Sequence, residues 1–336
     1  MTPLEMPENV NSQSTVQLCP PVLLIVFNRI ESTLKVLEAL RIAKPPRIFV
    51  AGDGPRPDRP GEVEKVAEVR ARVLREIDWP CEILTLFQER NLGCCHGPAS
   101  AISWFFQNVE SGIVLEDDCV PDATFFPYCA ELLERYATDE RVMMVSGNNF
   151  LFEKGGLIAD SYYFSKYHMI WGWATWRRAW EKFDPEMSEW PIFRKSGRLS
   201  ALHPRLDERR FWTRMFDQAH AERVRHIWDF QWLFAMWNNG GTCICPAVNL
   251  VSNVGYGADA THTLHKSRNM DMDLIPMTFP MRHPAQVRRR LLADNITCDN
   301  YFLQARRFRY WASLPNLWLQ LLRDEIHHRF PARSTK

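Results

Sequence analysis

Short apolar runs alternate with helical segments along the first 150 residues, and this alternation constrains the fold more than any other feature of the sequence. Each apolar run is as short as a buried strand, and each following segment repeats its apolar residues every three or four positions, as the buried face of a helix does. The pattern predicts an α/β fold with a mostly parallel sheet and helices on both faces. The expected strands are 22–27, 48–51, 82–86, 113–115 and 142–145, and the expected helices are the stretch from Glu31 to the Pro45-Pro46 pair, 62–77, 97–109 and 124–136.

Polar residues follow the first four of these strands where each strand ends. The carboxyl ends of parallel strands meet at one edge of a sheet, and ligands of open α/β sheets bind there. The sequence therefore predicts a binding site at this edge. Its candidate residues are Asn28 and Arg29, Asp53, Arg90 and Asn91, and Glu116, Asp117 and Asp118.

The acidic triplet Glu116-Asp117-Asp118 follows a strand that is expected to be buried. Three adjacent carboxylates repel one another unless they are solvated or a cation neutralises them. Oxygen ligands suit Mg²⁺ or Mn²⁺, which bridge carboxylates to substrate phosphates. The alternative is a solvated turn with an aspartate that caps the helix beginning near Asp122. The position at a strand end favours the metal.

The sequence lacks the glycine-rich loops that bind nucleotides in kinase-like and dinucleotide-dependent enzymes. A nucleotide would need other contacts. Asp53 lies between two glycines and could accept a hydrogen bond from a pyrimidine N–H, while Arg29 and Arg90 could bind diphosphate oxygens. The alternative for Asp53 is a plain turn residue before the Pro-rich loop 55–60.

Five motifs occur in an order that is informative when they are taken together. They are Ile25-Val26-Phe27-Asn28-Arg29, Val50-Ala51-Gly52-Asp53-Gly54, Val114-Leu115-Glu116-Asp117-Asp118 with Phe125-Phe126 after it, Trp228-Asp229-Phe230-Gln231-Trp232, and Gly257-Ala258-Asp259-Ala260-Thr261-His262. On these motifs, residues 20–265 resemble bacterial GT-A fold nucleotide-diphospho-sugar transferases of glycosyltransferase family 2. They resemble the N-acetylglucosaminyltransferase I type more distantly.

The resemblance implies a GT-A type, Rossmann-like sheet and a metal-dependent, inverting hexosyl- or N-acetylhexosaminyltransferase. The donor is a nucleotide-diphosphate sugar, with a UDP-sugar favoured, and the acceptor is a hydroxyl of a glycan or glycolipid. Asp118 would bind Mn²⁺ or Mg²⁺, Glu116 and Asp117 would lie around the ribose and sugar, and Asp53 would read the base. The first motif also assigns Phe27, Asn28 and Arg29 to the nucleotide-sugar, and the position after the third strand adds Arg90 and Asn91.

The resemblance also assigns Asp229 as the general base that deprotonates the acceptor hydroxyl. The distant relatives have two acidic residues between the tryptophans, whereas Asp229 is the only carboxylate here. His262 would complete the metal site or bind the diphosphate, or else be an ordinary loop histidine. Trp171 and Trp173 would stack on sugars, although most of the thirteen tryptophans are expected in the core.

Two other functions fit parts of the sequence. A sugar-1-phosphate nucleotidyltransferase shares such a sheet and its carboxylates, but it would have a glycine-rich basic loop after the first strand, and residues 28–31 contain no glycine. A catalytically silent sugar-nucleotide-binding protein is the second. Its loss of function would be expected to remove Asp118 or Asp229, and both are present.

Charge is distributed unevenly along the chain. Residues 280–336 contain eleven Lys or Arg and four Asp or Glu, which gives +7 and leaves about −6 for the first 279 residues. The overall charge of +1 argues against nucleic-acid binding. Arginines mixed with Trp311, Leu314 and Leu317 suit a helix at an anionic membrane surface, where a lipid-linked acceptor would lie, or a helix packed on the domain.

Nine scattered cysteines, with no signal peptide and no membrane-spanning apolar run, predict a reduced cytoplasmic protein. The basic C-terminal region adds the expectation that the protein is peripheral on the inner face of the membrane. The expected parts are a disordered tail (1–19), a nucleotide-sugar-binding half (20–150), an acceptor-side half (151–265) and a basic, mainly helical extension (266–336).

Overall fold

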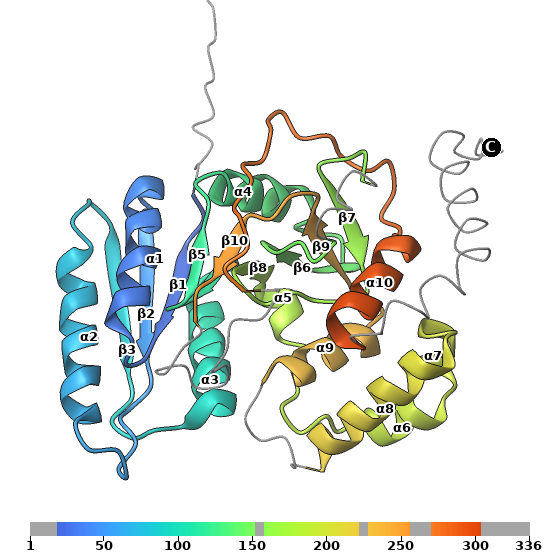
Figure 1. Ribbon diagram of the computed structural model, residues 1–336, viewed down its shortest axis with the longest axis horizontal. Coiled ribbons are helices and arrows are strands. Elements are labelled where there is room, and N and C mark those ends of the chain that lie inside the picture. Colours follow the sequence, from blue (N-terminus) through green and yellow to red (C-terminus); the bar gives the residue numbers. More distant parts are fainter. Residues whose placement is uncertain (1–18, 152–157, 222–227, 256–269, 304–336) are drawn as a thin grey trace, which may run out of the picture.

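The computed structural model describes residues 19–151, 158–221, 228–255 and 270–303, and its centre is an eight-stranded sheet (Figure 1). The strand order is β3-β2-β1-β4-β8-β6-β9-β7. β1 pairs in parallel with β2 and β4, β2 with β3, and β6 with β9. β8 is antiparallel to β4 and β6, and β7 is antiparallel to β9. The strands are β1 Val22–Val26, β2 Arg47–Gly52, β3 Glu82–Phe87, β4 Ser111–Glu116, β6 Val142–Ser146, β7 Tyr162–Ser165, β8 Trp173–Trp176 and β9 Thr242–Pro246.

Helices cover both faces of the sheet, as the alternation of apolar and helical segments predicts. Successive residues of a strand point to opposite faces, and in β1 the side chains of Leu23 and Leu24 enter two different cores. The first core includes the apolar face of α3, and the second includes those of α1, α2 and α4. The bounds are α1 Ile30–Ala43, α2 Glu62–Glu76, α3 Gly93–Asn108 and α4 Phe125–Arg135. The predicted α/β class, with a mostly parallel sheet, is confirmed.

Both predicted halves contribute strands to this one sheet. β7, β8 and β9 come from the acceptor-side half, and β8 inserts between β4 and β6. Helices from the same half lie away from β1–β3, and α6, α7, α8 and α9 gather at the lower right of Figure 1. They are α5 Arg177–Trp180, α6 Trp190–Lys195, α7 Arg198–Leu202, α8 Leu206–His220 and α9 Asp229–Asn238.

A small second sheet brings the chain back to the acidic triplet. β5 (Cys119–Pro121) begins directly after Asp118 and pairs antiparallel with β10 (Val251–Asn253). In this register Asn253 lies opposite Cys119, and the main-chain N–H of Val254 donates to the carbonyl of Asp118 at 2.9 Å. Residues 134 and 136 positions apart are therefore neighbours at the carboxyl edge of β4.

Residues 282–303 pack back against the β7 edge of the sheet. They contain α10 (Leu291–Thr297) and a π-helix (Cys298–Phe302), and the rest of this stretch is irregular. The N–H of Arg290 donates to the carbonyl of Phe164. Trp311, Leu314 and Leu317, which carry the membrane-surface prediction, lie outside the described residues.

Two further findings bear on the sequence predictions. All nine cysteines lie within the described residues and all are free thiols. No described helix combines the length and the apolar character that are needed to cross a membrane.

Candidate active site

A cavity of about 440 Å³ lies at the carboxyl ends of β1, β2 and β4. Its volume falls within the range that small-ligand sites have. The structure brings together nine residues that the sequence predicted for the site. These lining residues are Phe27, Arg29, Asp53, Asn91, Glu116, Asp117, Asp118, Trp171 and Asp229.

Arg29 holds the last two carboxylates of the triplet. Its Nη2 lies 2.5 Å from Asp117 Oδ1, and its Nη1 lies 2.9 Å from Asp118 Oδ2. The arginine side chain is 20% exposed, while the two carboxylates are almost fully buried. The cation that the triplet requires is thus supplied, in part, by the chain itself.

The remaining oxygens of this pair also have hydrogen-bond donors. Asp117 Oδ2 accepts from the N–H of Phe27 at 3.2 Å, and Asp118 Oδ1 accepts from Asn253 Nδ2 at 3.1 Å. Gly255 packs against the same carboxylate, since an added Cβ would lie 1.9 Å from Asp118 Oδ2. All four oxygens of Asp117 and Asp118 are therefore satisfied, and only the two on Arg29 have a partner that a ligand could draw away.

The triplet carries more negative charge than one guanidinium neutralises. Burial, followed by the charges of Asp118 and Asp117, raises the pKa of Glu116 to about 8. Burial also raises the pKa of Asp117, to about 6, although Arg29 opposes the shift. A buried acidic group with this surplus charge is suited to a second cation.

The carboxylate of Asp53 braces the loop that leads into α3. Oδ1 accepts from the N–H groups of Gly54 at 2.9 Å and Leu92 at 2.8 Å, and Oδ2 accepts from the N–H of Gly93 at 2.9 Å. Each carboxylate oxygen has two acceptor positions. One position on Oδ2 thus remains for a ligand N–H, so the turn role and the base-reading role are compatible.

Three of the residues predicted to bind the nucleotide have structural partners or lie away from the cavity. Asn28 does not line it, because its amide donates to Glu62 Oε1 at 2.9 Å. Arg90 is exposed and is not among the lining residues. Asn91 lines the cavity, and its amide donates to the carbonyl of Gly54 at 2.7 Å. Asn28 and Arg90 therefore lie outside the lining of this cavity, and their contacts with a ligand stay predictions.

Asp229 enters the cavity from α9, at the first residue of that helix. Its Oδ1 accepts from the N–H of Phe230 at 3.0 Å. The main-chain oxygen of Asp229 accepts from His168 Nε2 at 2.8 Å. The carboxylate is therefore carried on a helix turn that a buried imidazole holds in place.

The two tryptophans predicted to stack on sugars differ in exposure. Trp171 is partly exposed and lines the cavity. Trp173 is fully buried in β8, and its ring packs against Trp228 with 5.7 Å between centroids. The prediction for Trp173 is wrong, because the core covers both faces of its indole. Most of the other described tryptophans are buried too, as expected.

The structure adds residues to the site that sequence reasoning missed. Asn253 holds Asp118, His168 holds Asp229, and Tyr301 of the C-terminal stretch lines the cavity and stacks on Phe150 at 4.4 Å. The Asn253-Val254-Gly255 turn was the one local signal, because a polar residue and a glycine follow a strand there. His262 lies outside the described residues.

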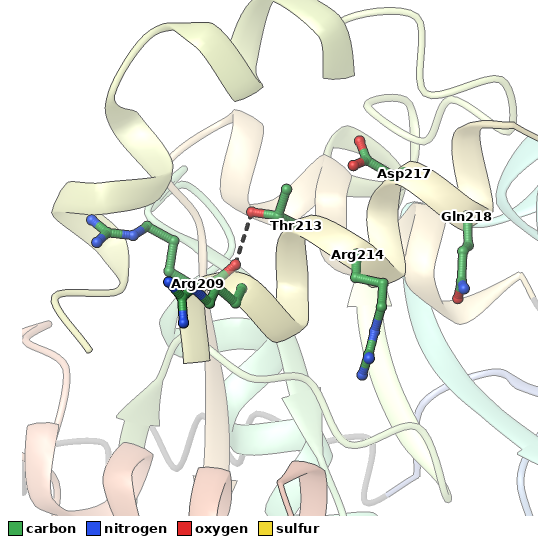
Figure 2. A pocket seen from close by; sticks show the side chains of 6 residues that line it. Arg209, Thr213, Arg214, Asp217 and Gln218 are labelled. Carbon is green, nitrogen blue, oxygen red and sulfur yellow. Dashed lines mark hydrogen bonds between the residues drawn. The ribbon is translucent and has the colours of Figure 1, made fainter. Parts of the chain in front are cut away.

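A groove of about 500 Å³ lies elsewhere, along the exposed side of α8 (Figure 2). All of its lining residues come from that one helix, and none belongs to the acidic cavity. The groove is polar because the exposed face of this helix carries arginines and other polar side chains. The lining residues are Arg209, Arg210, Thr213, Arg214, Asp217 and Gln218.

The residues around Asp118 fit a divalent ion in chemistry, but they form no complete cage. Among the described residues, no group of three or more His, Cys, Asp or Glu side chains is arranged to hold a metal. Mg²⁺ is commonly held by one or two carboxylates together with substrate phosphates and waters. The oxygen donors and the surplus negative charge of the triplet match that mode of binding.

Comparisons with known proteins give weak likenesses. No family model and no curated protein matches the chain. Among solved structures, HddC from Yersinia pseudotuberculosis is 11% identical, with 52% of this chain and 86% of that chain covered and a TM-score of 0.33. The same protein complexed with GMP-PN is 10% identical, with 47% of this chain and 77% of that chain covered and a TM-score of 0.30. GalNAc-T7 with UDP, GalNAc and Mn²⁺ is 12% identical, with 68% of this chain and 42% of that chain covered and a TM-score of 0.39. Likenesses of this size do not identify a function.

Proposed function

We propose that the protein is a metal-dependent, inverting glycosyltransferase that moves a sugar from a nucleotide-diphosphate donor, with a UDP-sugar favoured, to a hydroxyl of a glycan or lipid-linked acceptor. One observation carries the proposal. A single cavity at the carboxyl edge of the parallel strands is lined by the acidic triplet, by Arg29 and by Asp229 from α9. A donor held by the acidic triplet and Arg29 would have its anomeric carbon in the same cavity as the carboxylate of Asp229, which could act as the base.

The nucleotide would occupy the side of the cavity formed by the ends of β1 and β2. Asp53 has one free acceptor position for a base N–H, and Phe27 and Arg56 line the cavity nearby. Arg29 is placed to bind diphosphate oxygens through its planar fork of N–H donors. Glu116 and Asp117 would lie around the ribose and the donor sugar.

In the transfer step, Asp229 takes the proton of the acceptor hydroxyl. The acceptor oxygen forms a bond to the anomeric carbon as the bond from that carbon to the diphosphate oxygen breaks, and the nucleoside diphosphate leaves with the electron pair. Asp118 would hold a divalent ion, with His262 as a second candidate ligand, and the bound ion would supply positive charge to stabilise the departing diphosphate. Trp171 offers an indole face to a sugar ring.

The acceptor and the location follow from the charge of the C-terminal region. Its net charge of +7 from residue 280 onward favours contact with an anionic membrane surface, where a lipid-linked acceptor would be presented. This part of the proposal places the protein at the cytoplasmic face of a membrane.

Calorimetric titration with UDP, GDP and dTDP, each with and without Mn²⁺, tests the donor site. We expect one nucleotide to bind in a Mn²⁺-dependent manner, and Asp118→Ala to lose the metal-dependent part of its affinity while the protein stays folded. Asp122→Ala is a matched control, because Asp122 caps the turn before α4 and does not line the cavity. Unchanged metal-dependent affinity in Asp118→Ala would contradict the assignment.

A further inference from the structure

Arg29 occupies the position that a metal ion would take at the acidic triplet. Its guanidinium lies 2.5 Å from Asp117 Oδ1 and 2.9 Å from Asp118 Oδ2, on the wall of the cavity. The charges of Asp117 and Asp118 raise the pKa of the arginine further, against the opposing effect of burial. The guanidinium is therefore a permanent positive charge at this place.

The other contacts of Asp118 leave little choice of position for a metal ligand atom. Oδ1 is held by Asn253 Nδ2 at 3.1 Å, and Oδ2 is the oxygen that faces Arg29. An added Cβ on Gly255 would lie 1.9 Å from Asp118 Oδ2 and 2.9 Å from Arg29 Nη1. The chain at residue 255 thus packs closely against the ion pair, so that Oδ2 is crowded by Gly255 and faces the guanidinium as long as Arg29 stays in place.

A divalent ion that approaches Asp118 without any other ligand meets two obstacles. It has to displace the guanidinium from Oδ2, and it has to sit beside a like charge at close range, which is costly where water is largely excluded. A diphosphate removes both obstacles. It gives the guanidinium a doubly anionic, bidentate acceptor, which an arginine fork matches well.

We propose that Arg29 couples metal binding to diphosphate binding in this cavity, an inference that rests on the proposed function. Without a diphosphate, Arg29 stays on Asp118 and divalent ions bind weakly. With a nucleoside diphosphate, Arg29 turns to the phosphate oxygens and leaves Asp118 Oδ2 open to a divalent ion. By linkage, the ion strengthens diphosphate binding by the same factor.

The test is calorimetric titration of MnCl₂ alone, UDP alone, and each in the presence of the other, on the full chain. In the wild-type protein, we expect saturating UDP to tighten Mn²⁺ binding by about tenfold or more, within the usual range of coupling between sites. In Arg29→Met, Mn²⁺ alone should bind about tenfold more tightly than in wild type, and UDP should add little, because the competing charge has gone.

Two variants serve as controls. Arg56→Met removes a positive charge from the same cavity without touching the triplet, because Arg56 pairs with Glu62. It should leave the affinity for Mn²⁺ alone unchanged. Arg29→Lys keeps the charge but loses the fork, and should keep Mn²⁺ alone weakly bound while reducing the gain from UDP.

Several outcomes would overturn the inference. One is a folded Arg29→Met protein, judged by its circular dichroism and thermal melt, that binds Mn²⁺ alone no more tightly than wild type. Another is wild-type protein that binds Mn²⁺ equally well with and without UDP, which decides the matter even if Arg29→Met does not fold. A wild-type protein that binds no nucleotide would instead refute the proposed function, while the comparison with Mn²⁺ alone would still test the competition at Asp118.

Discussion

The Nε2–H of His168 donates a hydrogen bond to the main-chain oxygen of Asp229, 2.8 Å away. His168 is buried and lies in the segment of chain that connects β7 to β8, whereas Asp229 begins α9 and lines the cavity. Burial lowers the pKa of His168, so its ring is neutral near pH 7 and its Nε2 carries the hydrogen that a carbonyl acceptor requires. The contact ties the first turn of α9 to the sheet.

His168→Phe should slow sugar transfer about 10- to 100-fold, because small displacements of a reacting group have effects of this size. The phenyl ring keeps the shape of the side chain but cannot donate. The affinity for UDP should not change, since His168 does not line the cavity. His168→Gln restores a donor and should recover most of the rate. Steady-state kinetics and calorimetry check this. An equal loss of rate in both variants would reduce His168 to a packing residue.

Asp53→Ala should weaken UDP binding by about 1–3 kcal/mol, the range for a lost hydrogen bond at a buried site. Binding of Mn²⁺ with inorganic pyrophosphate should not change, because pyrophosphate has no base to read. Calorimetry on both ligands separates the two roles of Asp53. If both affinities fall together, the residue acts only as a brace for Gly54, Leu92 and Gly93.

Much of the fold was predictable because its signals are local. Apart from β5, which was not predicted, the strands and helices up to residue 146 begin and end within a few residues of the predicted positions, since apolar periodicity depends on neighbours in the sequence. The first residue of α3 is the largest difference, Gly93 in place of residue 97. The insertion of β8 between β4 and β6 was not predictable, because strand order depends on pairing between distant segments.

The sequence predicted which residues line the site better than it predicted which of them pair with one another. Glu116, Asp117, Asp118 and Asp229 line one cavity as expected. The pairing of Arg29 with two aspartates depends on side-chain geometry, which a sequence does not display. Asn253 and His168 act on residues 135 and 61 positions away. The prediction for Trp173 was wrong because the sequence does not distinguish a tryptophan that lines a site from one that is buried in the core.

A buried polar cluster at α8 predicts how stability depends on pH. Glu208 Oε1 accepts from Lys166 at 2.6 Å, from His203 at 2.9 Å and from the hydroxyl of Tyr167. Burial lowers the pKa of His203 to about 4, against the opposing effect of Glu208. His203 and Lys166 lower the pKa of Glu208 to about 2, although burial acts to raise it.

His203 and Glu208 therefore bind protons at a higher pH in the unfolded chain than in the folded chain. As pH falls below 6.5, His203 is protonated only in the unfolded state until about pH 4, and Glu208 adds to this loss from pH 4.5 down to about 2. The contribution of His203 to the free energy of unfolding should fall by about 1–3 kcal/mol between pH 7 and pH 4.5, whereas Glu116 and Asp117, whose pKa values are raised, act in the opposite direction. Urea unfolding at several pH values measures it. The difference in free energy of unfolding between wild type and His203→Asn should show this fall, and a difference that does not change with pH would exclude the cluster as its source.

Deletion of residues 304–336 should weaken attachment to anionic vesicles. The segment contains seven Lys or Arg and two Asp or Glu, and each basic residue near such a surface contributes about 1 kcal/mol. Co-sedimentation with vesicles that contain phosphatidylserine, at low and high salt, measures the attachment. Calorimetric binding of UDP should survive the deletion. Indifference of the full-length protein to these vesicles at low salt would favour the packed-helix reading of this segment.

Asp229→Asn should lower the transfer rate by roughly 10²- to 10⁴-fold, the usual contribution of a general base. The amide is nearly isosteric with the carboxylate but cannot take a proton. Donor affinity should survive, because the triplet and Arg29 are unchanged. A variant that loses donor binding as severely as activity would move the catalytic role to another residue.

Mass spectrometry of reactions that contain Mn²⁺, a panel of UDP-, GDP- and dTDP-sugars and a set of glycan and lipid-linked acceptors tests the central claim most directly. For the wild-type protein, we expect an acceptor to gain the mass of one sugar residue as a nucleoside diphosphate is released, and Asp229→Asn to give far less of both. The contradictory result is the formation of a nucleotide-diphosphate sugar and pyrophosphate from a nucleoside triphosphate and a sugar 1-phosphate, with no transfer to any acceptor.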